Sequence, residues 1–247
     1  MVSRQKKIKE IILIVQARMG STRLPGKMLL DLCGKPLVQR VLERVRNSKL
    51  VDKFILAVPD TKENDKLADF ADENNFYLFK GSEEDVLDRF YRAVTSFNNP
   101  DADSLIVRVC ADNPFVDPGE IDRAIDFFTH NNFDYVFNNI PALGNNYPNG
   151  LGAEVFGFGI LKKVWEKAKS PSHREHVTKY IWDNEKEFNI GTLKAPSSIA
   201  HTQIRIDVDA QQDLEKVRLI YERLIKKSKD RIFSAAEIID EIKSILD

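Results

Sequence analysis

The sequence predicts an α/β fold, in which a mostly parallel central sheet is covered by helices on both faces. Two observations favour this class: short apolar or β-branched runs recur along the 247 residues, and amphipathic stretches separate most of them. A helix between two successive strands forces a crossover connection, which makes the strands parallel. Because ligands of such folds bind at the carboxyl ends of strands, the loops that follow the strands are the candidate site.

The individual elements follow from local patterns. Five runs have the composition of buried strands: Ile11–Val15, Phe54–Val58, Ser104–Val109, Tyr135–Phe137 and Ile204–Val208. Five helix starts are expected where an N-cap residue precedes an acidic residue by three positions: Asp60 with Glu63, Ser82 with Asp85, Asp117 with Glu120, Ser172 with Glu175 and Ser234 with Glu237. Together they predict repeated strand and helix units.

The chain is expected to form a single domain over residues 1–247. The stretch PALGNNYPNGLG (Pro141–Gly152) is rich in turn-forming residues and introduces a less regular region at about residues 140–200. Cys33 and Cys110 match no metal or redox spacing and indicate reduced thiols in a cytoplasmic protein. The apolar run Ile11–Val15 is too short for a membrane span or a signal-peptide core.

Charge limits the class of partner. The 37 basic and 38 acidic residues leave a net charge of −1. Proteins that bind nucleic acid through bulk electrostatics usually carry a basic excess or a basic stripe. The composition therefore favours a small-molecule partner over a nucleic acid or a membrane.

The stretch QARMGSTRLPGK (Gln16–Lys27) follows the first expected strand and concentrates positive charge. Three cations within ten residues repel one another unless they face solvent separately or converge on an anion, and a polyphosphate fits best; the cations are Arg18, Arg23 and Lys27. Gly20 and Gly26 let backbone N–H groups approach such a ligand, and Ser21 and Thr22 add hydroxyl donors. A basic surface loop is the alternative. The spacing does not match a Walker A loop, and no G-x-G-x-x-G fingerprint is present.

A family resemblance extends this interpretation. QARMGSTRLPGKML and the following LCGKPLVQRVLERV resemble the opening signature of the cytidylyltransferases that make CMP-activated sugar acids, and are most similar to the branch of spore-coat polysaccharide biosynthesis protein F. Four further motifs match in order: GSEEDVLDRFYRA (81–93), VRVCADNPFVDP (107–118), SHREHVTKYIW (172–182) and RIDVDAQQDLEKVR (205–218). The resemblance therefore covers most of the chain.

The resemblance implies a Rossmann-like nucleotide-diphospho-sugar transferase architecture and a reaction. A sugar-acid hydroxyl attacks the α-phosphorus of CTP with Mg²⁺ present, pyrophosphate leaves, and a CMP-sugar for surface polysaccharide forms. Since the substrate supplies the nucleophile, the protein needs no Ser-His-Asp or Cys-His arrangement; it must position the substrates, neutralise phosphate charge and supply carboxylates for the metal. A homodimer is expected on the same ground.

By this resemblance, the loop binds the nucleotide. Gln16 and Ala17 lie near the cytosine, Gly20, Ser21 and Thr22 lie along the phosphates, and Arg18, Arg23 and Lys27 neutralise them. The metal would be held by Asp112 and Asp209, which with Arg18 and Lys27 complete the expected catalytic set. Each aspartate has another reading: Asp209 with Gln212 could cap a helix, and Asp112 before Asn113 and Pro114 could belong to a turn. Asp207 is a possible auxiliary ligand or a solvated residue.

The acceptor residues are inferred less directly. Arg174 suits a sugar carboxylate because a guanidinium can bind it through two hydrogen bonds, although Ser172 and Glu175 could instead form a capping box. His173 and His176 lack a third ligand at zinc spacing. The expected acceptor set is Arg89, Arg108, Tyr147, Arg174, Glu175 and His176.

One departure keeps alternatives open. The related 3-deoxy-manno-octulosonate cytidylyltransferases usually read Gln-Gly-Asp where this chain has Cys110-Ala111-Asp112, so a contact to the nucleotide is missing. A nucleotidyltransferase with another nucleotide or acceptor is therefore a second hypothesis. A glycosyltransferase using Asp207-Val208-Asp209 as its metal motif and a non-catalytic nucleotide-binding module are the others.

Overall fold

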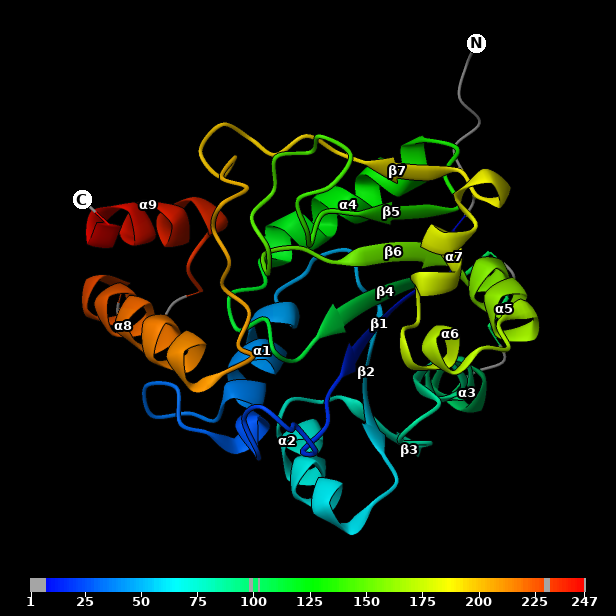
Figure 1. Cartoon of the computed structure of the whole chain (residues 1–247), viewed down its shortest axis with the longest axis horizontal. Helices are drawn as coiled ribbons and strands as arrows, with labels where there is room; N and C mark the ends of the chain where they lie inside the picture. The colour runs from blue at the N-terminus through cyan, green and yellow to red at the C-terminus, as the bar shows by residue number, and fades with distance from the viewer. Residues whose placement is uncertain (1–7, 98–99, 102, 229–231, 247) are drawn as a thin grey trace.

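The computed structural model describes residues 8–97, 100–101, 103–228 and 232–246 (Figure 1). Its strands are β1 (Ile11–Gln16), β2 (Lys53–Pro59), β3 (Tyr77–Gly81), β4 (Leu105–Cys110), β5 (Tyr135–Phe137), β6 (Glu154–Gly157) and β7 (Ile190–Thr192). Its α-helices are α1 (Leu37–Val45), α2 (Ala68–Glu73), α3 (Val86–Phe97), α4 (Pro118–His130), α5 (Phe158–Lys167), α6 (Pro171–Glu175), α7 (Lys179–Asp183), α8 (Gln211–Ser228) and α9 (Ala235–Leu246). Short 3₁₀ helices are η1 (Lys27–Leu29), η2 (Lys62–Leu67) and η3 (Glu185–Glu187).

The strands form one mixed sheet in the order β3-β2-β1-β4-β6-β5-β7. Neighbouring strands are parallel except at β6, which runs antiparallel to both β4 and β5. The chain builds outward from β1 to β2 and β3 on one side and then returns to place β4 on the other side. This change of direction between β1 and β4 is a topological switch point, where the loops after the two strands diverge and leave room for a ligand.

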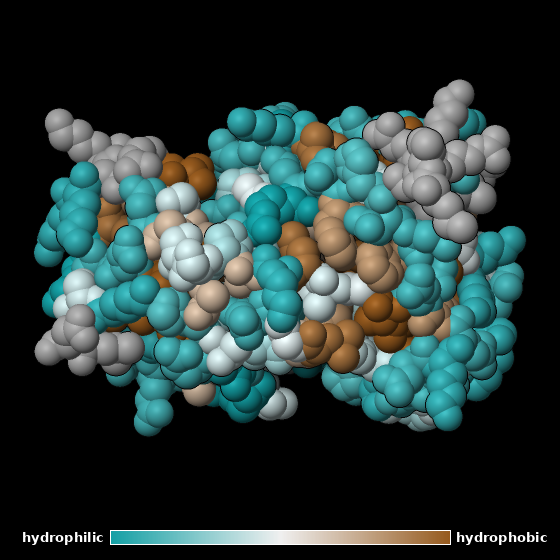
Figure 2. Space-filling model, turned by 90° about the horizontal axis from the view of Figure 1, so that it is seen from above, coloured by the Kyte–Doolittle hydropathy of each residue, from teal (hydrophilic) through white to brown (hydrophobic). Residues whose placement is uncertain are grey.

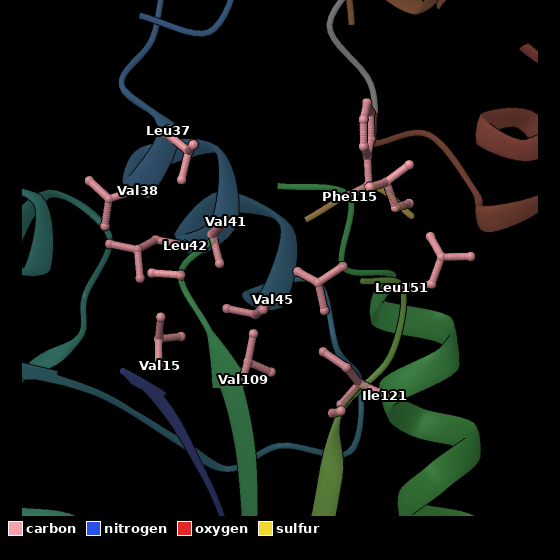
Figure 3. Packing of buried hydrophobic residues seen from close by; sticks show 14 of the residues in the cluster. Val15, Leu37, Val38, Val41, Leu42, Val45, Val109, Phe115, Ile121 and Leu151 are labelled. Atoms are coloured by element: carbon pink, nitrogen blue, oxygen red, sulfur yellow. The ribbon is translucent and has the colours of Figure 1, made fainter. Parts of the chain in front are cut away.

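Helices cover both faces of the sheet (Figure 1). On one face α1 and α4 share an apolar cluster with the odd-numbered side chains of β1 and β4, and α8 and α9, packed on each other, extend that cluster. On the other face α3, α5 and α7 share a cluster with Ile12, Ile14 and Ile106. Figure 3 shows the first contact closely: Val41 and Val45 of α1 lie next to Val15 and Val109. Apart from Gln16 and Arg108, the side chains on both faces of β1 and β4 are apolar, so the two strands are held in the centre of the molecule.

Four of the five expected strands are confirmed, and the fifth is wrong. The segment Ile204–Val208 is extended but pairs with the sheet nowhere; it forms an isolated bridge between Arg205 and Asn149. Its backbone is held instead by loops, with Val208 N–H donating to the carbonyl of Asp112 at 2.8 Å. Strands β3, β6 and β7 were not predicted from the sequence. The apolar run 153–158 is core, since it contains β6 between β4 and β5.

Two of the expected helix starts are confirmed. Asp117 caps α4 by accepting the N–H of Glu120 at 3.0 Å, and Ser234 forms a reciprocal capping box with Glu237 before α9. The other three are displaced. Thr61 precedes η2 without a side-chain cap, Asp85 rather than Ser82 caps α3 by accepting from Asp88 N–H, and Ser170 rather than Ser172 caps α6. A proline at the first helical position favours Ser170 over its competitor.

The outer surface is mainly polar. Seen from above, polar side chains surround scattered apolar ones (Figure 2), and large apolar residues exposed within the described part of the chain are Leu50, Tyr77, Leu143 and Leu219. The expected homodimer stays a prediction, as does the single-domain boundary at 1–247. Within the described ranges, no helix combines the length and the apolar character needed to cross a membrane.

A glycine next to β6 provides a test of this packing. A Cβ at Gly152 would lie 2.1 Å from Oδ1 and 2.4 Å from the carbonyl oxygen of the buried Asn138, whereas a Cβ at Gly157 meets nothing within 4 Å. We expect Gly152→Ala to lower the free energy of unfolding by about 3 kcal/mol because the overlap forces a backbone shift. The matched control Gly157→Ala should change it by less than about 1 kcal/mol. Equal urea midpoints for the two variants would contradict the packing described.

Candidate active site

A pocket of about 250 Å³ opens at the switch point between β1 and β4. The two strands end side by side, with Gln16 opposite Cys110 in the parallel register and Ala111 N–H donating to the carbonyl of Gln16 at 3.0 Å. Most of the predicted nucleotide residues line this pocket: Gln16, Ala17, Arg18, Ser21, Thr22, Arg23 and Lys27. Gly20 is not among the lining residues; it lies beside the carboxylate of Glu83.

The cationic loop after β1 is anchored by its apolar residues. Met19, Leu24 and Met28 are buried in the core, and the N–H of Met19 donates to Oδ1 of the buried Asn64 at 2.9 Å. The loop closes at Gly26, whose φ of 68° is left-handed and whose N–H donates to the carbonyl of Met19. With the apolar side chains turned inward, the cations are left at the pocket, so the loop is not a plain basic surface loop.

Lys27 connects three segments that are far apart in the sequence. Its buried Nζ donates to Asp112 Oδ2 at 3.1 Å, to the carbonyl of Val208 at 2.8 Å and to Asp209 Oδ1 at 3.5 Å. Arg23 and Arg205 reach Asp209 from the solvent side, at 2.9 and 2.8 Å. The two predicted metal ligands and two of the predicted loop cations are therefore brought together.

The charge around Asp209 keeps it ionised. Burial opposes ionisation, but Lys27, Arg23 and Arg205 outweigh it and lower the pKa of Asp209 below its ordinary value. A lowered pKa in the folded protein means that folding favours the ionised form. This carboxylate therefore contributes stability above its unfolded pKa of about 4, and the contribution is lost as the pH falls through the folded pKa.

Neither aspartate serves the structural role that its sequence context allows. Asp213, not Asp209, caps α8 by accepting the N–H groups of residues 209 and 210 at 3.0 and 2.8 Å. The carboxylate of Asp112 contacts Lys27 and makes no turn hydrogen bond among the described residues. Asp207 is neither solvated nor directed to the pocket, since Arg205 binds both of its oxygens at 2.7 and 2.6 Å.

The two aspartates form a donor set that fits one hard cation. Their carboxylates already converge on a positively charged atom, the ammonium of Lys27. No cluster of three or more metal-ligating side chains occurs in the described part of the chain. Mg²⁺ prefers one or two carboxylates together with substrate phosphates and water, so two aspartates suffice for Mg²⁺ but not for a zinc site built from protein alone.

The predicted acceptor residues divide into two groups. Arg89, Glu175 and His176 line the pocket. Arg174 binds Asp85 at 2.6 Å and faces an adjoining hollow of about 640 Å³, which shares Arg18 and Glu175 with the pocket.

The prediction is corrected for Arg108 and Tyr147, which do not line the pocket. The Tyr147 hydroxyl is buried against Glu120 and Arg123, at 2.5 and 2.9 Å, because its loop folds onto α4. Arg108 lies behind the pocket and binds Gln16 and Glu154.

The pocket also contains residues outside the predicted binding sets. Val86, Cys110 and Ala111 also line the pocket. Burial raises the pKa of the Cys110 thiol to about 12, so this side chain is uncharged near neutral pH. Arg205 was missed as a partner of Asp209. The sequence could have predicted this pairing, because side chains two residues apart in an extended segment share a face. Arg205, Asp207 and Asp209 are spaced in this way.

Comparison with known proteins agrees with this geometry. The family model described as Cytidylyltransferase matches residues 12–242, which includes every element from β1 to α9 except their outermost residues. The chain belongs to the cytidylyltransferase family. It is an enzyme of that family, built on the fold that the sequence predicted.

Relatives extend over nearly the whole chain. The spore coat polysaccharide biosynthesis protein SpsF of Bacillus subtilis is 33% identical over 93% of this chain and 92% of its own. A 3-deoxy-manno-octulosonate cytidylyltransferase of Francisella philomiragia is 28% identical over 85% of this chain and 86% of its own. A solved cytidylyltransferase from Leptospira borgpetersenii superposes with a TM-score of 0.84 at 27% identity, covering 96% of this chain and 95% of the other.

The Lys27 cluster predicts a measurable coupling. Replacing Lys27 with Met keeps the side-chain length but removes a cation that favours ionised Asp209, so the pKa of Asp209 should rise. Carboxyl carbon shifts followed by NMR over a pH series report this directly. Lys35→Met is the matched control, because Lys35 pairs with Glu43 outside the pocket. An unchanged Asp209 titration in the Lys27 variant would contradict the cluster.

Proposed function

We propose that this cytidylyltransferase is Mg²⁺-dependent and transfers CMP from CTP to a sugar acid in surface polysaccharide biosynthesis. The observation that carries the proposal is the convergence of two carboxylates and a cationic loop on one pocket at the sheet's switch point. This combination suits a nucleoside triphosphate with its metal, because the loop matches the phosphate charge and the carboxylates match the cation.

The chain's residues would act by position and charge. Arg18, Arg23 and Lys27 neutralise the triphosphate, while the hydroxyl groups of Ser21 and Thr22 lie along it. The N–H of Ser21 instead holds the loop together by donating to the carbonyl of Met19 at 2.8 Å. Asp112 and Asp209 would hold Mg²⁺, which when bound draws negative charge from the phosphates. In the reaction the acceptor oxygen bonds to the α-phosphorus, the bond from that phosphorus to the β-phosphate oxygen breaks, and pyrophosphate leaves. We assign to Asp209, together with the Mg²⁺ that it would hold, the lowering of the acceptor hydroxyl's pKa, and the proton of that hydroxyl would pass to solvent.

The carboxylate of a sugar acid fits beside Arg89 and Arg18, which line the same pocket as the aspartates. Arg89 is buried, and neither it nor Arg18 forms an ion pair with any described residue. Burial, followed by the charge of Arg18, lowers the pKa of Arg89 to about 10, so a bound anion would relieve both guanidinium groups. A carboxylate is such an anion, and the Francisella relative is named for a substrate that carries one.

The remaining hypotheses differ in how they use the aspartates. A glycosyltransferase would present Asp207 and Asp209 together to its metal, but Arg205 occupies both oxygens of Asp207 outside the pocket. A non-catalytic module would have no need for the paired carboxylates. A transferase for another nucleotide remains the second candidate, since Cys110 and Ala111 stand where the related octulosonate enzymes have Gln and Gly.

We further propose that the protein is a cytoplasmic homodimer that acts on small molecules.

Pyrophosphate release tests the proposal. CTP, ATP, GTP and UTP are each incubated with Mg²⁺ and a panel of 2-keto sugar acids and sugar phosphates. Release with CTP and a keto acid alone supports the proposal and identifies the acceptor class. Release with another pair transfers the function to the second candidate, and no release with any keto acid contradicts the proposal.

The carboxylate roles have a sharper test. With the accepted pair, Asp112→Asn should lower kcat/KM by about 100-fold or more, because one of the two charges that hold the metal is lost. Asp126→Asn is the matched control, since Asp126 is exposed on α4 and its partner is His130. Circular dichroism should show both variants folded. Near-normal turnover by the Asp112 variant would refute this assignment.

A further inference from the structure

A chain of buried polar side chains crosses the sheet directly behind the pocket. Arg108 on β4 lies opposite Glu154 on β6 in the antiparallel register, and the two form an ion pair. On its other side, Arg108 Nε donates to Gln16 Oε1 at 3.0 Å. Arg108 pairs in register with Ile14, two residues before Gln16, so the arginine and the glutamine share one face of the sheet.

Glu154 fixes the far end of this chain. Its buried carboxylate accepts the Tyr135 hydroxyl at 2.5 Å and the Thr178 hydroxyl at 2.7 Å, in addition to Arg108. A buried charge is tolerated when its hydrogen-bonding capacity is filled in this way. The arginine therefore has little freedom to move, and Thr178 connects the same network to the segment that carries His176 into the pocket.

The network determines which end of the Gln16 amide faces the ligand. A guanidinium has N–H donors and no acceptor, so the amide atom that faces Arg108 must be the oxygen. The amide nitrogen of Gln16 has no hydrogen-bond partner among the described residues and is not enclosed by protein, while the residue lines the pocket. Gln16 consequently presents its N–H donors to whatever binds there.

We infer that Arg108 is a positioning residue: with Glu154, it locks the Gln16 amide as a fixed hydrogen-bond donor to the nucleobase. The inference rests on the proposed function, which places a cytosine beside Gln16 and Ala17. Cytosine offers two acceptors, ring N3 and carbonyl O2, to such a donor. The contact compensates for the absent glutamine at the end of β4, where Cys110 lines the pocket and its side chain has no amide group.

Isosteric substitution separates this role from a structural one. Gln16→Glu keeps an oxygen for Arg108 but replaces the free N–H donors with an oxygen, and Gln16→Met removes both groups. Titration calorimetry measures binding of Mg²⁺–CTP and of Mg²⁺–tripolyphosphate, which has the phosphates without a base. We expect Kd for CTP to rise about tenfold or more in both variants, with tripolyphosphate unchanged within about twofold. Gln203→Glu, in an exposed loop, is the control.

Arg108 is tested through Gln16. Arg108→Lys keeps the charge beside Glu154 but loses the planar group that reaches both partners, so CTP binding should weaken and tripolyphosphate binding should not. Because the two residues act in series, the effects of Arg108→Lys and Gln16→Met on CTP should not add in the double variant.

The results of these binding experiments distinguish a failure of this inference from a failure of the proposed function. Unchanged CTP binding in Gln16→Glu, equal weakening for both ligands, or additive effects in the double variant would overturn the inference alone. A rise in KM for the acceptor without a rise in KM for CTP would do the same, by assigning Gln16 to the acceptor. If the wild-type protein bound neither CTP nor tripolyphosphate, the proposed function would fail first.

Discussion

The arrangement of the site depends on one buried ammonium group. Lys27 Nζ joins the loop after β1 to Asp112, which follows β4, and to Val208 and Asp209, which precede α8. Desolvating a cation costs several kcal/mol unless charged and polar partners surround it, so these contacts must form together or not at all. The contacts of Lys27 bring the two carboxylates to one shared cation. They also fix the position of the extended segment before α8, which does not pair with the sheet.

The sheet makes this meeting possible. Strands β1 and β4 end side by side because the chain reverses its direction of growth between them, and helices on both faces hold the two strands rigid (Figures 1 and 3). The charged residues then divide into two layers. Lys27, Asp112 and Asp209 face the pocket, whereas Arg108 and Glu154 stand behind it and orient what faces it. In the proposed function, substrate chemistry and substrate selection would therefore rest on separate ion pairs.

Sequence patterns predicted the fold class, four strands and a cationic loop after the first strand, because buried strands and such loops have strong local signatures. The family resemblance supplied most of the other residues that line the pocket, Asp112 and Asp209 among them. They failed where long-range partners decide. The run Ile204–Val208 has strand composition, but no strand of the described sheet lies beside it to form hydrogen-bonded pairs. Arg108 looked like an acceptor ligand because strand alternation cannot reveal that Glu154 lies opposite it on β6. Tyr147 was misplaced for the same reason, since its partners Glu120 and Arg123 lie on α4.

The central claim is that Asp112 and Asp209 share one metal ion with the nucleotide held by the loop 16–27. Anomalous diffraction from crystals grown with Mn²⁺ and CTP, without acceptor, tests it most directly, since manganese replaces Mg²⁺ in oxygen sites and can be located by its own scattering. The account predicts an anomalous peak in contact with both carboxylates and a triphosphate oxygen, with the base beside Gln16. A peak that touches neither aspartate, or a nucleotide bound away from the switch point, would contradict it.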